Sequence, residues 1–596
     1  MFKQIIKGAS VIPLQFLGVM DVDMNQVQSN ELMKYGLMNL LGEGKEGGYA
    51  VRHSQAAVSD FGRDLEGQER DMNPLAAAFP TLFPYGRGGF ENSRRHFVSF
   101  NEQAHWSMQF YDQHFRTHHT FPFVVFGIEQ KRKALSSARV QMHRPDFERN
   151  KLAIGSISCA DMRVAVQEEA EGKTPSDPRI RLLRKHVFGA SSQVMGSDNS
   201  RVLYRGCIWG TTLLLRGPSL WVTINPNDIH DPVAQVFAGE EINMDDFIAT
   251  IGPDMHRRAS NIAKDPFAAT KYFYFILGVV FSALFAVDVD RNVVNARMGV
   301  IGQVSAYFGV VEAQGRGTLH LHCFIWLQDT PNLFQLRDLL KSPEFLHKIR
   351  HYLRKNVRAH VDGLDEETIR TTPRESQIGY SRPPDPDGPE WEEENEELER
   401  RVVRSSQIHS CSMSTCLRYD RYGRLSCKRR APWPLSDQET VDEAGNWSPK
   451  RTYGFMNNFC PAITKTLLCN NDIKFITNGK DTKDVMWYTT SYATKKQSKN
   501  NNVSALMAKA LLYHESHPDH LTSLLERNRL LIFRCQQAIN REMELSGPQV
   551  MSYIMGYGDC IQSHHYAPLY WIAVQKLVER SFPEVKGYNN KLVSRL

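Results

Sequence analysis

Glu312-Ala-Gln-Gly-Arg-Gly-Thr-Leu-His320-Leu-His322-Cys-Phe-Ile-Trp-Leu327 is the stretch from which the fold of this chain can be predicted. Apolar, β-branched and aromatic residues lie on both sides of Gly315-Arg316-Gly317, and this pattern predicts a β-hairpin with a three-residue loop. Because side chains alternate faces along a strand, His320 and His322 point to the same side. With this loop, Glu312 becomes the cross-strand partner of His320, at about 5 Å between Cβ atoms.

These three side chains predict a metal site. Two imidazoles and a carboxylate suit Mn²⁺, Zn²⁺, Fe²⁺ or Co²⁺, and suit Mg²⁺ less well. A one-residue change of register would turn Glu312 away, and Gln314 would then be the substitute ligand. The same ligand set fits a non-haem iron oxygenase or a zinc hydrolase, and two histidines also meet in strands by chance, so further residues must decide.

The second informative stretch is Trp487-Tyr488-Thr-Thr-Ser-Tyr492-Ala-Thr-Lys495-Lys496. On a helix, Tyr488 and Tyr492 stand four residues apart on one face. A phenol, with a pKa of about 10, is a poor nucleophile unless a metal polarises the phosphate and nearby cations favour the phenolate. The two tyrosines could simply pack in a helix face. Beside a metal site, however, they indicate two sequential phosphodiester transfers, with Tyr488 and Tyr492 as the catalytic residues.

Together, these two stretches resemble the motifs of a known family. The HUH endonucleases have a histidine-hydrophobic-histidine strand and a tyrosine nucleophile on a helix, and this chain is similar to the replication-initiator region of Helitron rolling-circle transposases. The resemblance extends from about residue 75 onward. It is carried by these tracts: Val311–His322, Phe79–Pro84, Ser219–Pro226, Cys469–Gly479, Gln549–Gly556 and Ser563–Tyr566.

The resemblance implies an α/β (α+β) fold, in which a central antiparallel sheet of the HUH type is flanked by helices. It also implies a DNA endonuclease and strand transferase. Glu312, His320 and His322 would hold one Mg²⁺ or Mn²⁺, and a tyrosine would attack to give a 5′-phosphotyrosine and a free 3′-hydroxyl. The expected substrate is single-stranded or melted DNA at transposon ends and at the target.

The chain departs from the family in two ways. Helitrons usually show a pattern like Y-x-x-K-Y-x-x-K, and here Ser491 replaces the first lysine while Lys495 keeps the second. A catalytically inactive, DNA-binding descendant is therefore the alternative function. The family also carries a helicase downstream, whereas the sequence has no G-x-x-x-x-G-K-[ST] phosphate loop, so we expect the helicase to be absent from this chain.

Charge indicates the DNA contacts only weakly. The chain has 72 basic and 66 acidic residues, and a net charge of +6 is too mild to establish nucleic-acid binding. A helix opened by Ser176-Asp177-Pro178 would bury its apolar side chains and leave its basic ones outside. The expected DNA contacts are Arg181, Arg184, Lys185, Arg316, Lys495 and Lys496.

A structural zinc site is predicted further along the chain. His409, Cys411, Cys416 and Cys427 supply the four soft or imidazole ligands that a closed tetrahedral Zn²⁺ site needs. Three unrelated cysteines are the alternative. A metal-stapled module would explain how a basic segment with little apolar content stays ordered, and the resemblance to Helitrons implies a similar His/Cys-rich segment.

The sequence also predicts a domain order and a location. No convincing signal peptide opens the chain, and the apolar tract from Tyr272 to Val287 is shorter than a membrane span, so we expect an intracellular, nuclear protein with that tract buried on the sheet. Seven regions are expected: 1–73, of uncertain structure; 74–200, a DNA-binding domain; 201–360, the first part of the nuclease core; 361–405, an acidic and proline-rich solvated linker; 406–450, the zinc module; 451–500, the tyrosine helix; and 501–596, a helical C-terminal region.

Overall fold

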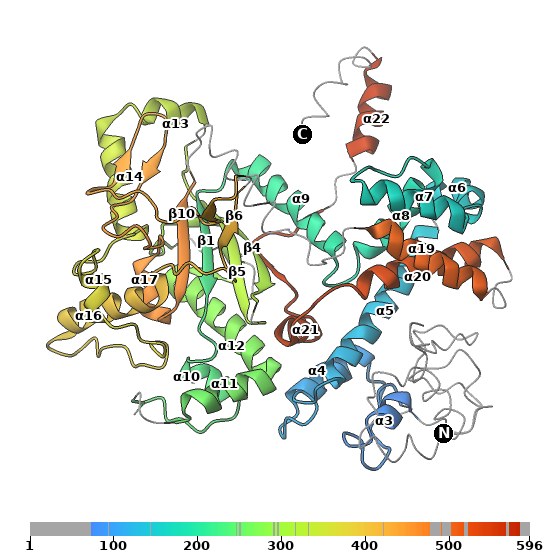
Figure 1. Ribbon diagram of the computed structural model, residues 1–596, viewed down its shortest axis with the longest axis horizontal. Coiled ribbons are helices and arrows are strands. Elements are labelled where there is room, and N and C mark those ends of the chain that lie inside the picture. The colour runs from blue at the N-terminus through green and yellow to red at the C-terminus, as the bar shows by residue number, and fades with distance from the viewer. Residues whose placement is uncertain are drawn as a thin grey trace.

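The computed structural model describes residues 73–92, 95–142, 145–245, 247–248, 252–289, 293–294, 297–315, 317–331, 333–420, 422–476, 490, 502–517, 523–567 and 571–583. Within them, helices and a central sheet form a mixed fold, as the sequence predicts (Figure 1). The helices before the first strand are α3 (Pro74–Ala78), α4 (Phe100–Gln109), α5 (Phe121–Met142), α6 (Pro145–Gly155), α7 (Cys159–Ala170), α8 (Pro178–Ser191) and α9 (Asp198–Leu215).

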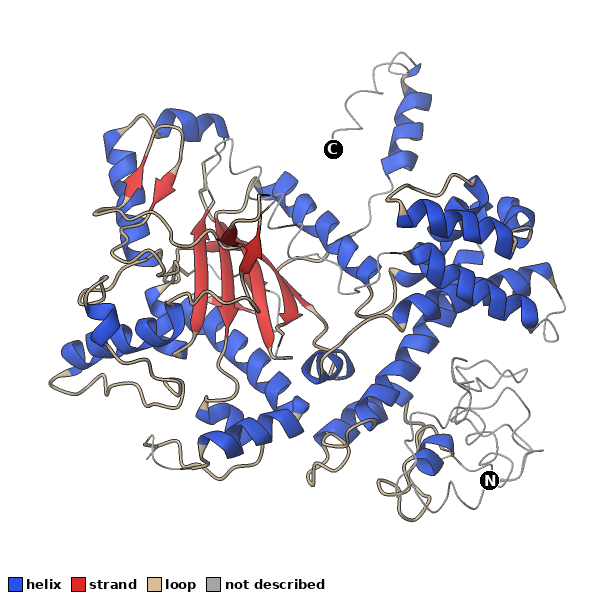
Figure 2. Ribbon diagram, in the orientation of Figure 1, coloured by secondary structure: helices blue, strands red, loops and turns tan. Residues whose placement is uncertain are grey.

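The central sheet has five antiparallel strands in the order β10-β1-β5-β4-β11 (Figure 2). Their bounds are β1 (Leu220–Asn225), β4 (Val304–Ala313), β5 (Leu319–Leu327), β10 (Asn470–Phe475) and β11 (Cys560–Gln562). The central strand, β5, and its neighbour β4 form the predicted hairpin. The outer strands come from segments far away in the sequence, so the sheet is assembled from four separate parts of the chain.

Apolar side chains cover both faces of this sheet. Successive residues of a strand point to opposite faces, and the strands contribute buried apolar side chains to each face. One face, with Val222, Leu321 and Ile325, packs on α12 (Pro266–Val279), η4 (Val280–Leu284) and α17 (Pro461–Leu467). The other face, with Phe324 and Trp326, packs on α9. The histidines of β5 belong to this second face, since they share its residue parity.

Among the described residues, one helical segment, Pro266–Leu284, is long and apolar enough to cross a membrane by length and composition alone, and 56% of its apolar stretch is buried inside the protein. Its residues Tyr272, Phe273 and Leu277 belong to the core beneath the sheet. The tract from Tyr272 is therefore packed on the sheet, as predicted.

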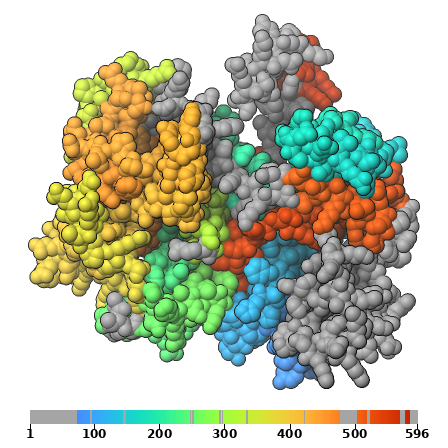
Figure 3. Space-filling view, viewed as in Figure 1, coloured from blue at the N-terminus to red at the C-terminus, as the bar shows by residue number. Residues whose placement is uncertain are grey.

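The predicted N-terminal domain and the predicted C-terminal helical region share one hydrophobic core. Helices α19 (Val503–Ser516) and α20 (Leu524–Asn540) pack on α5, α6, α7 and α8 through side chains such as Met507, Leu531 and Leu183. Figure 3 shows the cyan and orange-red segments lying against each other. We call this body, α5–α8 with α19 and α20, the helical lobe.

The segment expected to be a solvated linker is folded, and that prediction is wrong. It contains α15 (Thr368–Thr371), α16 (Trp391–Val402) and the π-helical turn η5 (Val403–Gln407). Leu398 and Val402 of α16 are buried, and Glu399 accepts a hydrogen bond from Arg358 at 3.0 Å. The other glutamates of the helix, from Glu392 to Glu397, are exposed and form the outer face of an amphipathic helix, so their charges do not oppose packing.

The remaining elements lie around the sheet and the helical lobe. They are α10 (Pro232–Phe237), α11 (Met255–Lys264), β2 (Val287–Asp288), β3 (Val293–Val294), α13 (Leu333–Leu339), α14 (Pro343–Asn356), β6 (Leu417–Tyr419), β7 (Leu425–Cys427), β8 (Thr440–Val441), β9 (Trp447–Ser448), α21 (Gly547–Ile554) and α22 (Trp571–Ser581).

Candidate metal centre

The hairpin register brings the three predicted metal ligands together. Glu312 of β4 pairs with His320 of β5, which is the register that a loop at residues 315–317 predicts. One donor atom from each of Glu312, His320 and His322 lies within 4.8 Å of the others. The fold thus gathers two imidazoles and a carboxylate on the sheet face that α9 covers.

The spacing of the donor atoms fits a single metal ion. The Nε2 atoms of His320 and His322 are 2.9 Å apart, and each lies 4.0 Å from Oε2 of Glu312. Adjacent ligands of an octahedral ion at about 2.1 Å stand about 3.0 Å apart, whereas two nitrogens of a tetrahedral zinc site stand about 3.4 Å apart. The two nitrogens have the spacing of adjacent octahedral ligands, whereas the carboxylate oxygen lies farther from each of them, so the distances indicate a site for one ion and do not select the metal.

Both imidazoles are held neutral, with lone pairs available for a cation. Burial lowers the pKa of His320 to about 4, and burial together with neighbouring His320 lowers the pKa of His322 well below its ordinary value. The Nδ1 atom of His322 lies 3.0 Å from the hydroxyl of Thr223, and its ring stacks on Trp221. These contacts orient Nε2 of His322 toward the centre of the site.

A buried arginine holds the carboxylate, and the sequence analysis missed it. Arg201 of α9 is fully buried and its Nη2 donates to Oε1 of Glu312 at 2.9 Å. The second oxygen of Glu312, Oε2, is the one that faces both histidines. The ion pair therefore fixes which oxygen is turned to the metal site, and its charge also lowers the pKa of both imidazoles.

Two further polar residues lie on the same sheet face. The side-chain amide of Gln314, the alternative ligand, donates to Oδ1 of Asn225. Lys474 of β10 pairs with Trp221 of β1 and is exposed, so its ammonium lies on the edge of the face that carries the histidines. Only the strand order of the sheet, which no local pattern shows, could have identified Lys474.

Several predicted site residues lie outside the described residues. They are the two catalytic tyrosines, Tyr488 and Tyr492, and the three basic residues Arg316, Lys495 and Lys496. The strand that precedes the tyrosine segment, β10, ends at Phe475 next to β1.

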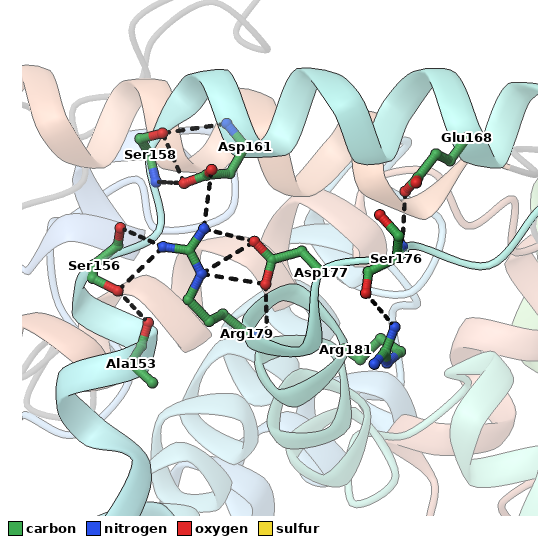
Figure 4. Close-up of polar contacts among 9 residues, drawn as sticks. All are labelled: Ala153, Ser156, Ser158, Asp161, Glu168, Ser176, Asp177, Arg179 and Arg181. Carbon is green, nitrogen blue, oxygen red and sulfur yellow. Dashed lines mark hydrogen bonds and ion pairs between the residues drawn. The ribbon is translucent and has the colours of Figure 1, made fainter.

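The predicted basic helix exists, but its cations are partly engaged in the helical lobe. Helix α8 begins after Asp177, whose side chain caps the helix as predicted. Arg181 is exposed and donates to the carbonyls of Pro175 and Ser176, and Figure 4 shows its contact with Ser176. Arg184 is half-buried and pairs with Glu169 at 3.0 Å. The prediction that Arg184 lies outside is thus wrong, because its guanidinium binds a carboxylate of α7. Lys185 is exposed.

The four predicted zinc ligands also cluster. The Nε2 atom of His409 lies 3.4 Å from the sulfur of Cys411, 3.4 Å from that of Cys416 and 3.3 Å from that of Cys427. In a tetrahedral zinc site the nitrogen and sulfur ligands stand about 3.5 Å apart, so the donor set fits Zn²⁺. The cluster lies at the base of the β6–β7 hairpin, at which Cys427 pairs with Leu417.

Comparison with known families identifies the region around the metal centre. Residues 103–325 match a family model described as the Helitron helicase-like domain at the N-terminus. The matched span contains Arg201, His320, His322 and Glu312. A search of curated proteins found no match for this chain. Over residues 103–325 the chain is therefore similar to the Helitron helicase-like domain at the N-terminus.

Proposed function

We propose that this chain is a metal-dependent, single-strand DNA endonuclease and strand transferase of the HUH type. The observation that carries the proposal is the ligand set of Glu312, His320 and His322, whose donor atoms converge within 4.8 Å inside a Helitron helicase-like domain. A bound Mg²⁺ or Mn²⁺ would polarise the scissile phosphate and neutralise the charge that develops on it.

The residues of the chain have separate roles in this reaction. Glu312, His320 and His322 bind the cation, and Arg201 and Thr223 orient two of them. The phenol oxygen of Tyr488 or Tyr492 attacks phosphorus in line, forming a tyrosine–phosphate bond as the bond to the 3′ oxygen breaks. The tyrosine loses a proton and the 3′ oxygen gains one, so a 5′-phosphotyrosine and a free 3′-hydroxyl result. The second tyrosine can repeat the transfer on another strand.

A covalent-adduct assay tests the proposal. The protein is incubated with Mn²⁺ and labelled single-stranded oligonucleotides that carry element-end sequence, and a denaturation-resistant adduct is the expected product. Tyr488→Phe combined with Tyr492→Phe should abolish the adduct, because phenylalanine has no nucleophilic oxygen. His320→Ala combined with His322→Ala should abolish it too. Tyr111→Phe, at a tyrosine that is 85% exposed, is the control and should leave it unchanged.

The outcomes separate the enzyme from its nearest alternative. An adduct that survives the double tyrosine substitution refutes the nucleophile assignment. DNA and metal binding without any adduct would identify a catalytically inactive descendant, for which Ser491 in place of lysine is the sequence feature.

We propose further that His409, Cys411, Cys416 and Cys427 hold a structural Zn²⁺, and that the protein acts on nuclear DNA.

A further inference from the structure

The β6–β7 hairpin has the proposed zinc-ligand cluster at its base. The backbone N–H of Lys428 donates to the carbonyl of Cys416 at 2.8 Å. The backbone N–H of His409 donates to the carbonyl of Phe455 at 2.8 Å, which connects the base of the hairpin to the rest of the protein. At the tip, Oδ1 of Asp420 accepts from the backbone N–H of Tyr422 and of Arg424. The turn is thus ordered by its own side chain.

This ordered hairpin exposes aromatic side chains. Tyr419 is 67% exposed and Tyr422 is 66% exposed, and Leu425, the cross-strand partner of Tyr419, is 48% exposed. The guanidinium of Arg424 lies 5.2 Å from the ring centroid of Tyr422. Rings on a rigid support lose little conformational entropy when a ligand stacks on them.

The same segment is strongly basic. Between His409 and Arg430 the sequence has six basic residues and one acidic residue. The acidic residue, Asp420, is engaged in the turn and in an ion pair with Arg424 at 3.2 Å. The exposed cations among the described residues of the hairpin and its base are Arg418, Arg424, Lys428, Arg429 and Arg430. A polyanion with stackable rings complements this surface.

We propose that the β6–β7 hairpin is a binding surface for single-stranded DNA. Unpaired bases stack on Tyr419 and Tyr422, and the phosphates between them contact the surrounding arginines and lysines. A duplex keeps the faces of its bases inside the stack, so the tyrosines favour unpaired strands. The proposal rests on the DNA-processing function proposed above, for which the hairpin would hold the strand apart from the metal centre.

Fluorescence anisotropy of the full chain with labelled oligo(dT) tests the proposal. Measurements are made with His320→Ala and His322→Ala present, so that binding is observed without cleavage. Adding Tyr419→Ala and Tyr422→Ala should weaken binding by about tenfold or more, since each stacked base contributes on that order. Phenylalanine at both positions should restore the affinity. The matched control is Tyr85→Ala with Tyr111→Ala, at tyrosines that are 88% and 85% exposed, and it should bind as the parent does.

Zinc content is measured on every variant, so that unfolding of the module is recognised. Unchanged affinity of the zinc-loaded alanine variant overturns the proposal, as does an equal loss in the control pair. An equal loss toward duplex DNA overturns the preference for single strands, and tighter binding of oligo(rU) overturns DNA as the partner. The proposed nuclease function is scored separately by the covalent adduct, so either idea can fail while the other stands.

Discussion

At the scale of single residues, Arg201 has the largest consequence for the metal centre. Its guanidinium is buried and binds one oxygen of Glu312, which leaves the other oxygen for the metal. Three ligands with one carboxylate carry a single negative charge, and Arg201 balances it. The site would therefore bind a divalent cation weakly on its own and more tightly when a DNA phosphate supplies further negative oxygens.

Arg201→Met should lower Mn²⁺ affinity and the rate of adduct formation by about tenfold or more, the usual effect of losing a residue that orients a ligand. Arg201→Lys should also lose affinity, because an ammonium cannot reproduce the planar fork. Mn²⁺ binding is measured by calorimetry in the presence of uncleavable DNA. Arg205→Met, one turn further along the same helix, is the control.

A double-mutant cycle shows whether Arg201 acts through the carboxylate. In a Glu312→Gln background, Arg201→Met should cause no additional loss of Mn²⁺ affinity, and an additive loss would contradict the positioning role. Circular dichroism of each variant establishes that the fold is retained.

The metal ligands could be predicted from sequence because they lie within one hairpin. Glu312 and His320 are cross-strand neighbours, and the alternation of strands places His322 beside His320. Arg201 is 111 positions from its partner, and Thr223 is 99 positions from His322. No local period relates such residues, so their roles depend on the strand order and on the helix that covers the sheet.

At the scale of elements, the acidic run and the zinc module show how context changes a local prediction. The run around Glu390 to Glu399 has the composition of a linker, yet it forms α16 because Leu398 and Val402 share one buried side. The four proposed zinc ligands were predicted from the chemistry of their side chains. The sequence did not predict that they would lie at the base of a hairpin. The amino-acid composition of these segments therefore indicated that many of their side chains are exposed, but it did not indicate which side chains pack in the core.

Removal of one of the four proposed zinc ligands should release the metal and leave the central sheet intact. Cys416→Ser is the sharpest change, since Cys416 is 1% exposed and its sulfur lies 3.4 Å from Nε2 of His409. Elemental analysis should find one zinc per chain in the parent and none in the variant. Cys207→Ser, at a cysteine on α9 outside the cluster, should keep the zinc.

Hydrogen exchange measured on the Cys416→Ser variant shows which segments lose structure. Amides of β6 and β7 should lose protection in Cys416→Ser, whereas those of β4 and β5 should keep it, because the central sheet has its own core on both faces. Equal loss in both places would show that the module and the sheet unfold as one unit.

At the scale of the whole molecule, the helical lobe joins segments that the sequence analysis assigned to different domains. Its core combines residues from 138 to 190 with residues from 503 to 535. An amphipathic pattern predicted α8, but such a pattern does not indicate which partner a helix packs on. The central sheet is also assembled from distant segments, so domain order along the chain could not be inferred from composition.

The helical lobe should make stability depend on pH through His514. Burial, with Arg534 and Arg527 nearby, lowers the pKa of His514 to about 4, and Arg534 donates to its Nδ1 at 3.0 Å. An unfolded histidine has a pKa of about 6.5, so between pH 6.5 and 4 the unfolded chain binds a proton that the folded chain excludes. Stability is retained above pH 6.5 and falls as the pH is lowered through this window.

Urea unfolding at pH 7.5 and pH 5 measures this effect. His514→Gln should reduce the difference in unfolding free energy between the two pH values, because the substituted side chain does not titrate. His517→Gln, at the end of the same helix, should leave the difference as in the parent. A pH dependence that is identical in all three proteins would contradict the role of His514.

The edge strand β11 makes the central sheet depend on a distant part of the chain. It pairs with β4 through Cys560 and Val310, two residues before Glu312, although it lies far beyond the matched family region. A gene copy that acquires an early stop codon before this strand would keep every predicted metal ligand and both tyrosines, yet would leave the ligand-bearing strand at an open edge. Such a copy should lose the pairing of β11 with β4, so an intact reading frame through the last strand is a requirement of the proposed activity in addition to the histidine motif.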